Sequence, residues 1–173
     1  MKRFLLNNGS EYSYEQLLAS LNESDKYYLL YKQLDLYLFF VNLIKALANN
    51  APLVLLDADL NETEIDGVNV AEINVPTKIV STTFVNMEAV VEAVKNSTSE
   101  ITIFTSGTTG QPKKVVHCVQ TLMRAVRFGE KYINQVWAYA YNPTHMAGLQ
   151  VFFQAFMNLN FLVNVFNKSR TEV

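Results

Sequence analysis

The chain has 173 residues, of which 50% are hydrophobic and 17% are charged. This length and composition are typical of one globular domain with a buried core, and they exclude an intrinsically disordered chain. The net charge is −2, and the sequence shows no basic stripe and no RNA-binding motif. These features argue against a nucleic-acid-binding protein.

The cellular compartment is expected to be the cytoplasm. Cys118 is the single cysteine, so an internal disulfide is impossible and a reducing compartment is favoured. No secretory signal is apparent at the N-terminus. Residues 132–167 contain no Asp, Glu, Lys or Arg, but Asn, Gln, Pro143 and His145 interrupt them every few residues. No membrane span is expected, because a spanning helix needs about 20 mostly apolar residues in a row.

The first hundred residues alternate between strand and helix patterns. Phe4 to Leu6 and Glu11 to Tyr14 predict two strands joined by a tight Asn-Gly turn, and Ser13-x-x-Gln16 predicts a capping box that begins a helix. The remaining predictions here are a long helix at 25–48, a buried strand at 51–57, an acidic surface connection at 58–76, a helix capped by Asn86 that ends near 96, and a strand at 100–104. The acidic connection could ligate a metal, but a solvated loop fits its composition better.

The second part of the chain continues the alternation of strand and helix patterns. It predicts a helix at 115–134, a strand at 136–141, a loop at 142–145, a helix at 146–159 and a strand at 161–166. Helix following strand throughout predicts an α/β fold. We therefore expect residues 1–173 to form a single domain or subdomain with a mixed or parallel sheet flanked by helices.

The run from Thr105 to Lys114, which reads TSGTTGQPKK, predicts a phosphate-binding loop. Glycines permit close backbone approach, successive backbone N–H groups can form an anion-binding nest, and hydroxyls and lysine add donors. The run is not a Walker A sequence, because Pro112 stands where that motif requires glycine. The alternative is a flexible surface loop, but such a loop does not require this order of residues between a strand and a helix.

This run resembles the signature loop of the adenylate-forming superfamily, which comprises acyl- and aryl-CoA synthetases, peptide-synthetase adenylation domains and luciferases. The family pattern is Thr/Ser-Ser-Gly-Thr-Thr-Gly-x-Pro-Lys. The family usually has glycine where this chain has Lys114, and often histidine where this chain has Val119, so His117 is only an alternative candidate beside an ordinary helix-start or surface histidine. The resemblance implies ATP and Mg²⁺ as cofactors, and it implies that the phosphates are held by Thr105, Ser106, Gly107, Thr108, Thr109, Gly110 and Lys113.

A second motif follows the predicted strand at 136–141. Ligands of open α/β sheets bind at the carboxyl ends of strands, where His145 is expected to lie. Acyl- and aryl-CoA synthetases have a proline, then a histidine two residues on, then Gly-Leu; Pro143, His145, Gly148 and Leu149 fit that pattern. The resemblance implies that His145 lines the acyl pocket as a catalytic residue. The alternative is a histidine that caps a loop.

The resemblance covers essentially the whole chain but only the N-terminal portion of the family fold, and it leans toward compact enzymes of the o-succinylbenzoate-CoA ligase type. It implies two-step activation of a carboxylic acid as an acyl-adenylate, followed by transfer to the thiol of CoA or of a carrier protein. The family's later elements, including its catalytic lysine, are not found, so whether this chain is an enzyme stays open and no activity is expected alone. The alternative is a non-catalytic binding or assembly module that a second polypeptide completes. An exposed sheet edge predicts self-association.

Overall fold

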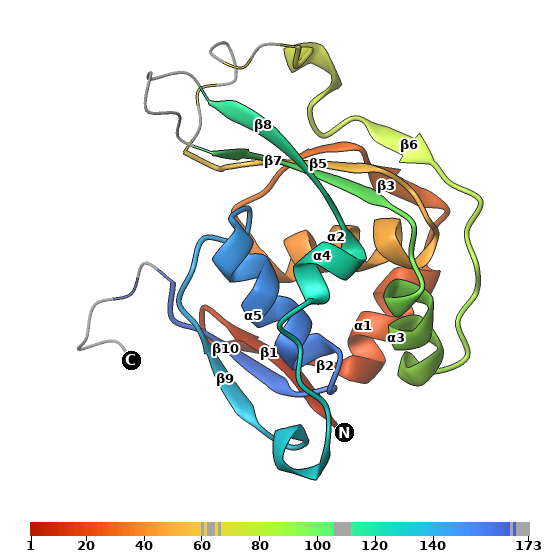
Figure 1. Ribbon diagram of the computed structural model, residues 1–173. Coiled ribbons are helices and arrows are strands. Elements are labelled where there is room, and N and C mark those ends of the chain that lie inside the picture. Colours follow the sequence, from red (N-terminus) through yellow and green to blue (C-terminus); the bar gives the residue numbers. More distant parts are fainter. Residues whose placement is uncertain (60, 62–64, 66, 106–111, 167, 169–173) are drawn as a thin grey trace.

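Helices pack between two four-stranded sheets in the part of the chain that the structure describes (Figure 1). This computed structural model describes residues 1–59, 61, 65, 67–105, 112–166 and 168. The mixed parallel and antiparallel sheets flanked by helices confirm the predicted fold class. The division of the strands into two sheets with a shared helical layer was not predicted.

The first sheet contains the N-terminal hairpin and two strands from the C-terminal third, in the order β2-β1-β10-β9. Its strands are β1 (Arg3–Asn7), β2 (Ser10–Ser13), β9 (Val136–Tyr139) and β10 (Phe161–Asn164). The hairpin turns through Asn8 and Gly9, which both have positive φ, as a tight Asn-Gly turn requires. The predicted capping box is confirmed, because the Ser13 side chain accepts from Gln16 N and the Gln16 side chain accepts from Ser13 N.

The second sheet has the order β4-β5-β7-β8, and a separate pair is formed by β3 and β6. The strands are β3 (Lys26–Tyr28), β4 (Leu30–Lys32), β5 (Leu53–Leu56), β6 (Pro76–Lys78), β7 (Glu100–Thr105) and β8 (Lys113–Cys118). β4, β5 and β7 run parallel to one another, and β8 returns antiparallel to β7. β8 is therefore an edge of this sheet and β9 is an edge of the first.

The helical layer carries the aromatic core. Its helices are α1 (Tyr14–Asn22), α2 (Leu36–Ala48), α3 (Met87–Lys95), α4 (Val119–Met123) and α5 (Met146–Phe156), with short 3-10 turns η2 (Val70–Glu72) and η3 (Glu130–Tyr132). Phe40 of α2 stacks on Phe152 of α5 with ring centroids 4.5 Å apart, and it meets Tyr139 of β9 edge-on at 5.4 Å. These buried rings fix α5 against α2, and α5 carries the candidate histidine at its start.

The predicted helix at 25–48 is wrong in its first third. Residues 26–32 form β3 and β4, and α2 begins only after Asp35, whose side chain accepts from Leu38 N. A short aromatic and apolar run does not distinguish a buried strand from a helix by its periodicity. Pairing of β3 with β6 and of β4 with β5, which no local pattern reveals, decides in favour of strands.

The predicted helix at 115–134 is also wrong. Residues 113–118 form β8, α4 covers only 119–123, and η3 is the next helical turn. Val115 and Val116 are β-branched and favour a strand once β7 is available as a partner. The predicted phosphate loop therefore joins two antiparallel strands rather than a strand and a helix. No helix of the described residues is long and apolar enough to cross a membrane.

Candidate functional site

The β7–β8 hairpin positions both ends of the predicted phosphate loop. β7 ends at Thr105 and β8 begins at Lys113, and the two residues are direct partners in the antiparallel register. The predicted site residues Ser106, Gly107, Thr108, Thr109 and Gly110 lie outside the described residues. Lys113 is exposed at the first position of β8.

A cavity of about 500 Å³ lies between this hairpin and the start of α5. Most of its walls are apolar, and they come from both strands and from the first turn of the helix. Its lining residues are Ile103, Phe104, Thr105, Val115, His117, His145, Met146 and Ala147. Thr105 ends a strand of one sheet and His145 follows a strand of the other, and these residues of separate motifs thus line one cavity. His117, only an alternative candidate in the sequence, lines the same cavity, whereas Lys113 does not.

His145 is the N-cap residue of α5 and keeps an extended backbone. Its side chain makes no capping hydrogen bond and is 54% exposed, so the imidazole is free to face the cavity. The first-turn N–H groups of α5 then have no side-chain acceptor at the cap. An anion in the cavity would be attracted to this helix start as well as to a protonated imidazole.

The carboxylate of Asp57 contacts the imidazole of His145. Asp57 follows the last residue of β5, and its Oδ2 lies 3.3 Å from His145 Nε2. The same oxygen accepts a hydrogen bond from Asn142 Nδ2 at 2.6 Å. This carboxylate therefore joins the end of a strand in one sheet to the loop that follows β9 in the other.

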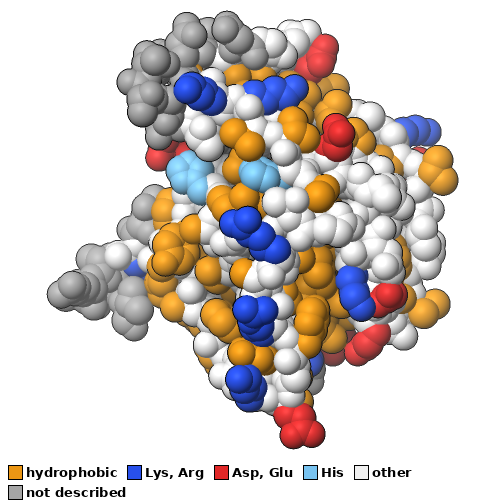
Figure 2. All heavy atoms as spheres, in the orientation of Figure 1, with side chains coloured by type: hydrophobic (Ala, Val, Ile, Leu, Met, Phe, Trp, Pro, Cys, Tyr) orange, Lys and Arg blue, Asp and Glu red, His pale blue; other side chains and the backbone are white. Residues whose placement is uncertain are grey.

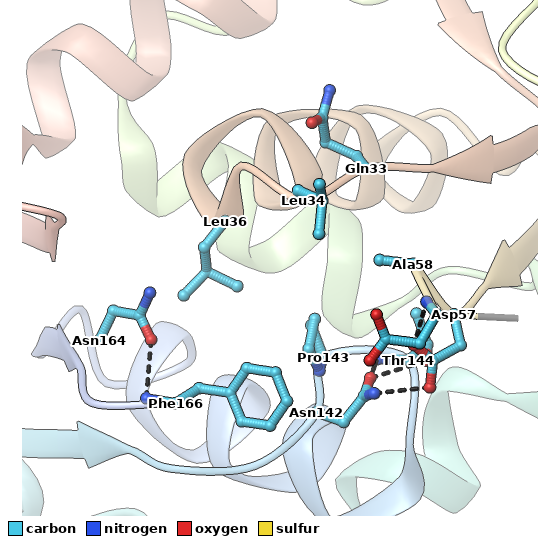
Figure 3. A pocket seen from close by; sticks show the side chains of 11 residues that line it. Gln33, Leu34, Leu36, Asp57, Ala58, Asn142, Pro143, Thr144, Asn164 and Phe166 are labelled. Carbon is cyan, nitrogen blue, oxygen red and sulfur yellow. Dashed lines mark hydrogen bonds between the residues drawn. The ribbon is translucent and has the colours of Figure 1, made fainter. Parts of the chain in front are cut away.

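Asn142 organises that loop, as Figure 3 shows. Its Oδ1 accepts from the backbone N–H of Thr144 at 2.9 Å and from the Thr144 hydroxyl at 2.8 Å, while its amide donates to Asp57. Its backbone oxygen accepts from His145 N at 3.2 Å. Four hydrogen bonds around one side chain and its carbonyl thus set the position from which α5 and His145 begin. A small cavity of about 70 Å³ adjoins this loop.

Gly148 permits the loop and the helix to approach each other. A Cβ at this position would lie 2.1 Å from the backbone oxygen of Asn142 and 2.9 Å from the hydroxyl of Tyr139. Any other residue would push α5 away from the loop. The predicted motif thus has a steric reason for its glycine, and Leu149 beside it is fully buried.

Sequence reasoning missed Asp57 and Asn142. Asp57 ends the predicted strand at 51–57, and the carboxyl end of a parallel strand is a position where ligand-binding residues collect, so a signal was available. Asn142 begins the predicted loop before His145, but its role depends on Asp57, which lies 85 residues earlier in the chain. No group of three or more His, Cys, Asp or Glu in the described residues could hold a metal ion.

Comparisons with known proteins support the resemblance at the level of fold. No protein-family model matches the chain, and no curated protein matches it. Solved structures are similar over nearly the whole chain. One is o-succinylbenzoate CoA synthetase (MenE) from Bacillus subtilis in complex with the intermediate OSB-AMP, which is 15% identical with a TM-score of 0.60; the match covers 99% of this chain and 54% of that chain. Wild-type E. coli MenE with a bound analogue of OSB-AMS is 15% identical with a TM-score of 0.64, over 99% of this chain and 44% of that chain, and the inhibitor-bound N-terminal domain of FACL13 from Mycobacterium tuberculosis is 13% identical with a TM-score of 0.66, over 98% of this chain and 55% of that chain.

These identities establish the fold alone. The chain spans about half the length of the solved structures that it matches. The fold and the chain-wide coverage agree with the family suggested by the loop and histidine motifs. The chain resembles the N-terminal part of an adenylate-forming ligase.

Proposed function

We propose that this chain is the N-terminal part of an ATP-dependent, AMP-forming acyl- or aryl-CoA ligase and that it forms one unit over residues 1–173. The observation that carries the proposal is the shared cavity, where Thr105 of the loop motif and His145 of the second motif meet. Two independent motifs that converge on one cavity favour a reaction site over two unrelated loops. Alone, this half of the fold is proposed to bind ligand without completing the reaction.

The proposed reaction has two steps. A carboxylate oxygen attacks the α-phosphorus of ATP, and the bond to the bridging oxygen breaks, so pyrophosphate leaves with that electron pair. A thiolate of CoA or of a carrier protein then attacks the carbonyl carbon of the acyl-adenylate, and AMP leaves. Mg²⁺ would supply charge neutralisation of the phosphates, and no group of three or more His, Cys, Asp or Glu among the described residues could hold it.

Residues of this chain have separate roles in the proposal. The loop residues Thr105 to Gly110 and Lys113 hold the β- and γ-phosphates, which leave as pyrophosphate. His145 and the start of α5 orient the carboxylate, while Phe104, Val115 and Met146 contact the apolar body of the acid. Asp57 orients the imidazole through its contact with Nε2. These groups act by binding and orientation, which supply much of the rate enhancement in reactions of this type.

A titration of the purified chain tests the cavity. Benzoate and octanoate, added separately, should shift the backbone amide NMR signals of Ile103, Val115 and Met146 with millimolar affinity. His145→Ala should weaken binding about tenfold, whereas benzamide and octanamide, which lack the charge, should not bind the wild type. If neither benzoate nor octanoate shifts these amide signals, the proposed carboxylate site is refuted. Because the chain is proposed to be inactive alone, carboxylate-dependent ATP–pyrophosphate exchange by it would contradict that part of the proposal.

A second candidate function is a binding or assembly module that another polypeptide completes. It is favoured by β9, an edge strand in which Val136 is 60% exposed, because such edges pair readily with another chain. The coding sequence around this one distinguishes the candidates. A Tyr-Gly-x-Thr-Glu-like segment in the same reading frame supports the ligase, and a separate neighbouring gene that encodes it supports the two-chain form.

A further inference from the structure

A further cavity, of about 240 Å³, lies over one face of α2, and we refer to it as the α2 cavity. The end of α1 and the strands β3 and β4 form its other walls. None of its lining residues lines the His145 cavity, which belongs to the face of the molecule that carries both histidines (Figure 2). A ligand in the α2 cavity would therefore occupy a separate site. The residues that line it from α2 recur at the spacing of one helical face: Leu38, Val41, Asn42 and Lys45.

Lys45 places a cation in this cavity that lacks a full set of partners. It is only 6% exposed, and lysine is almost never buried unless it is paired. Its Nζ donates to the backbone oxygen of Ser24 at 3.1 Å and to the Ser24 hydroxyl at 3.3 Å. An ammonium has three N–H donors, so one of them has no acceptor among the residues that the structure describes. Lys45 also forms no salt bridge with a described carboxylate, and a bound anion would supply the missing acceptor and the missing charge.

The charges around the α2 cavity favour a ligand with one negative charge. Two lysines and one glutamate line it, and Lys26 and Glu23 are exposed whereas Lys45 is buried. Burial lowers the pKa of the Lys45 ammonium, and the carboxylates of Glu23 and Asp25 oppose this shift only in part. A carboxylate in direct contact with Nζ would stabilise the charged form more strongly than these more distant groups do.

The other polar side chains of the α2 cavity already have partners. Asn42 Oδ1 accepts from Tyr28 N at 2.8 Å, and Asn42 Nδ2 donates to the Tyr28 backbone oxygen at 2.9 Å. The hydroxyls of Ser20 and Tyr37 lie 2.9 Å apart and form a hydrogen bond. These bonds hold the walls in place, as the walls of a preformed binding site are held. The ammonium of Lys45 is the charged donor that remains for a ligand.

Three tyrosines give the α2 cavity an aromatic lining. The rings of Tyr28 and Tyr31 stack with centroids 5.2 Å apart and planes 13° apart. Tyr37 is stacked on Tyr12 at 3.8 Å, which fixes its ring. A cavity of about 150 Å³ can hold benzene, so about 240 Å³ holds one ring with a charged substituent. Acetate or phosphate would leave the aromatic walls uncovered, and a nucleotide is larger than this space.

We propose that the α2 cavity is a second ligand site, which binds a single-ring aromatic carboxylate with the carboxylate on Lys45 and the ring against the tyrosines. Lys45 supplies the charge-assisted hydrogen bond, and the aromatic walls select a flat ring over a saturated one. The site does not depend on the proposed reaction, because it uses none of the residues that line the His145 cavity.

NMR titration of the full chain with benzoate tests this site. The backbone amide signals of Ser24, Val41 and Lys45 should move together, with a Kd of about 1 mM for so small a ligand. Lys45→Met keeps an unbranched side chain but removes the ammonium, and it should weaken benzoate binding at least about tenfold. Lys95→Met is the matched control, because it removes the same charge from the exposed face of α3. It should bind benzoate at the α2 cavity within about twofold of wild type.

Comparison of ligands on the wild type needs no substitution and so tests the site even if Lys45→Met fails to fold. Cyclohexanecarboxylate should bind about threefold more weakly than benzoate, because it has the charge without the aromatic ring, and Tyr28→Leu should reduce that difference. Benzamide, which has the ring without the charge, should leave the three signals unmoved.

Several results would overturn the inference. These are unmoved signals with benzoate, equal binding of benzoate by Lys45→Met and wild type, equal weakening by both lysine variants, or equal binding of benzamide or inorganic phosphate. Equal binding of cyclohexanecarboxylate would remove the aromatic selectivity. The amide signals of Ile103, Val115 and Met146, recorded in the same spectra, report the His145 cavity. His145→Ala should leave the α2 cavity unchanged, so a failure at either site is distinguishable from a failure at the other.

Discussion

Gly148→Ala gives the sharpest test of the geometry around His145. The new Cβ would lie 2.1 Å from the Asn142 oxygen and 2.9 Å from both the Asn142 carbonyl carbon and the Tyr139 hydroxyl. The nearest atom belongs to the backbone and cannot rotate away, so α5 and the loop must separate by roughly 1 Å in a close-packed region. That separation breaks contacts of buried groups and moves His145 relative to Asp57.

Gly148→Ala is expected to lower the stability of the protein, whereas helix propensity alone would raise it. Alanine is favoured over glycine within a helix by about 1 kcal/mol, so propensity alone predicts a more stable protein. Overpacking costs about 1–3 kcal/mol, and the direct backbone clash places this site at the upper end. The net loss is about 1–2 kcal/mol, which lowers Tm by roughly 2–8 °C for a domain of this size.

Urea unfolding followed by circular dichroism measures this loss. Ala147→Gly is the matched control, because Ala147 is exposed in the same helical turn and should lose only the propensity term of about 1 kcal/mol. The His145 ring signals in NMR spectra should move in Gly148→Ala and stay in place in Ala147→Gly. A Gly148→Ala protein that is more stable than wild type, with unmoved His145 signals, would refute the steric argument.

The remaining predictions concern a carboxylate, a buried hydroxyl and a sheet edge. Asp57→Ala should cost about 1–3 kcal/mol in urea unfolding, since it leaves the Asn142 amide without its acceptor, and Asp57→Asn should recover part of that loss. Burial raises the pKa of the Tyr14 and Tyr139 hydroxyls, so the neutral forms favour the folded state. Above about pH 10 tyrosines of the unfolded chain ionise while these two resist ionisation, so Tm should fall as the pH rises from about 8 to about 11. Tyr139→Phe should flatten that fall and cost little at neutral pH, because the hydroxyl has no hydrogen-bond partner among the described residues. Self-association through β9 should give a mass above 19.7 kDa by light scattering, and Val136→Lys should restore the monomer.

Each of these predictions has a contradicting outcome. A fully stable Asp57→Ala protein would mean that its contacts with Asn142 and His145 are not needed to hold the loop. A Tm that is level up to about pH 11 would show that the buried tyrosines are not linked to stability in this way. A wild-type chain that elutes as a clean monomer at high concentration would remove the argument for self-association through β9.

Local signals predicted several elements well. The Ser13–Gln16 capping box and the Asn86 cap, whose side chain accepts from Ala89 N, form hydrogen bonds between residues three apart, so the sequence contains everything that they need. The strand at 100–104 is likewise confirmed by β7. The strands at 26–32 and 113–118 were misread because their partners lie elsewhere in the chain, and a helical pattern looked equally possible without those partners.

By itself, the sequence determined the Asn-Gly hairpin, the helix caps at Ser13 and Asn86, the loop motif and the histidine motif, because each depends on neighbouring residues. Tertiary structure alone decided that the strands separate into two four-stranded sheets and a two-stranded pair, and that β8 forms an edge of its sheet. It also brought Asp57 into contact with Asn142, 85 residues further along the chain, and with His145. Side-chain convergence of this kind requires chain crossings and a close approach at Gly148, which depend on packing in three dimensions rather than on local pattern.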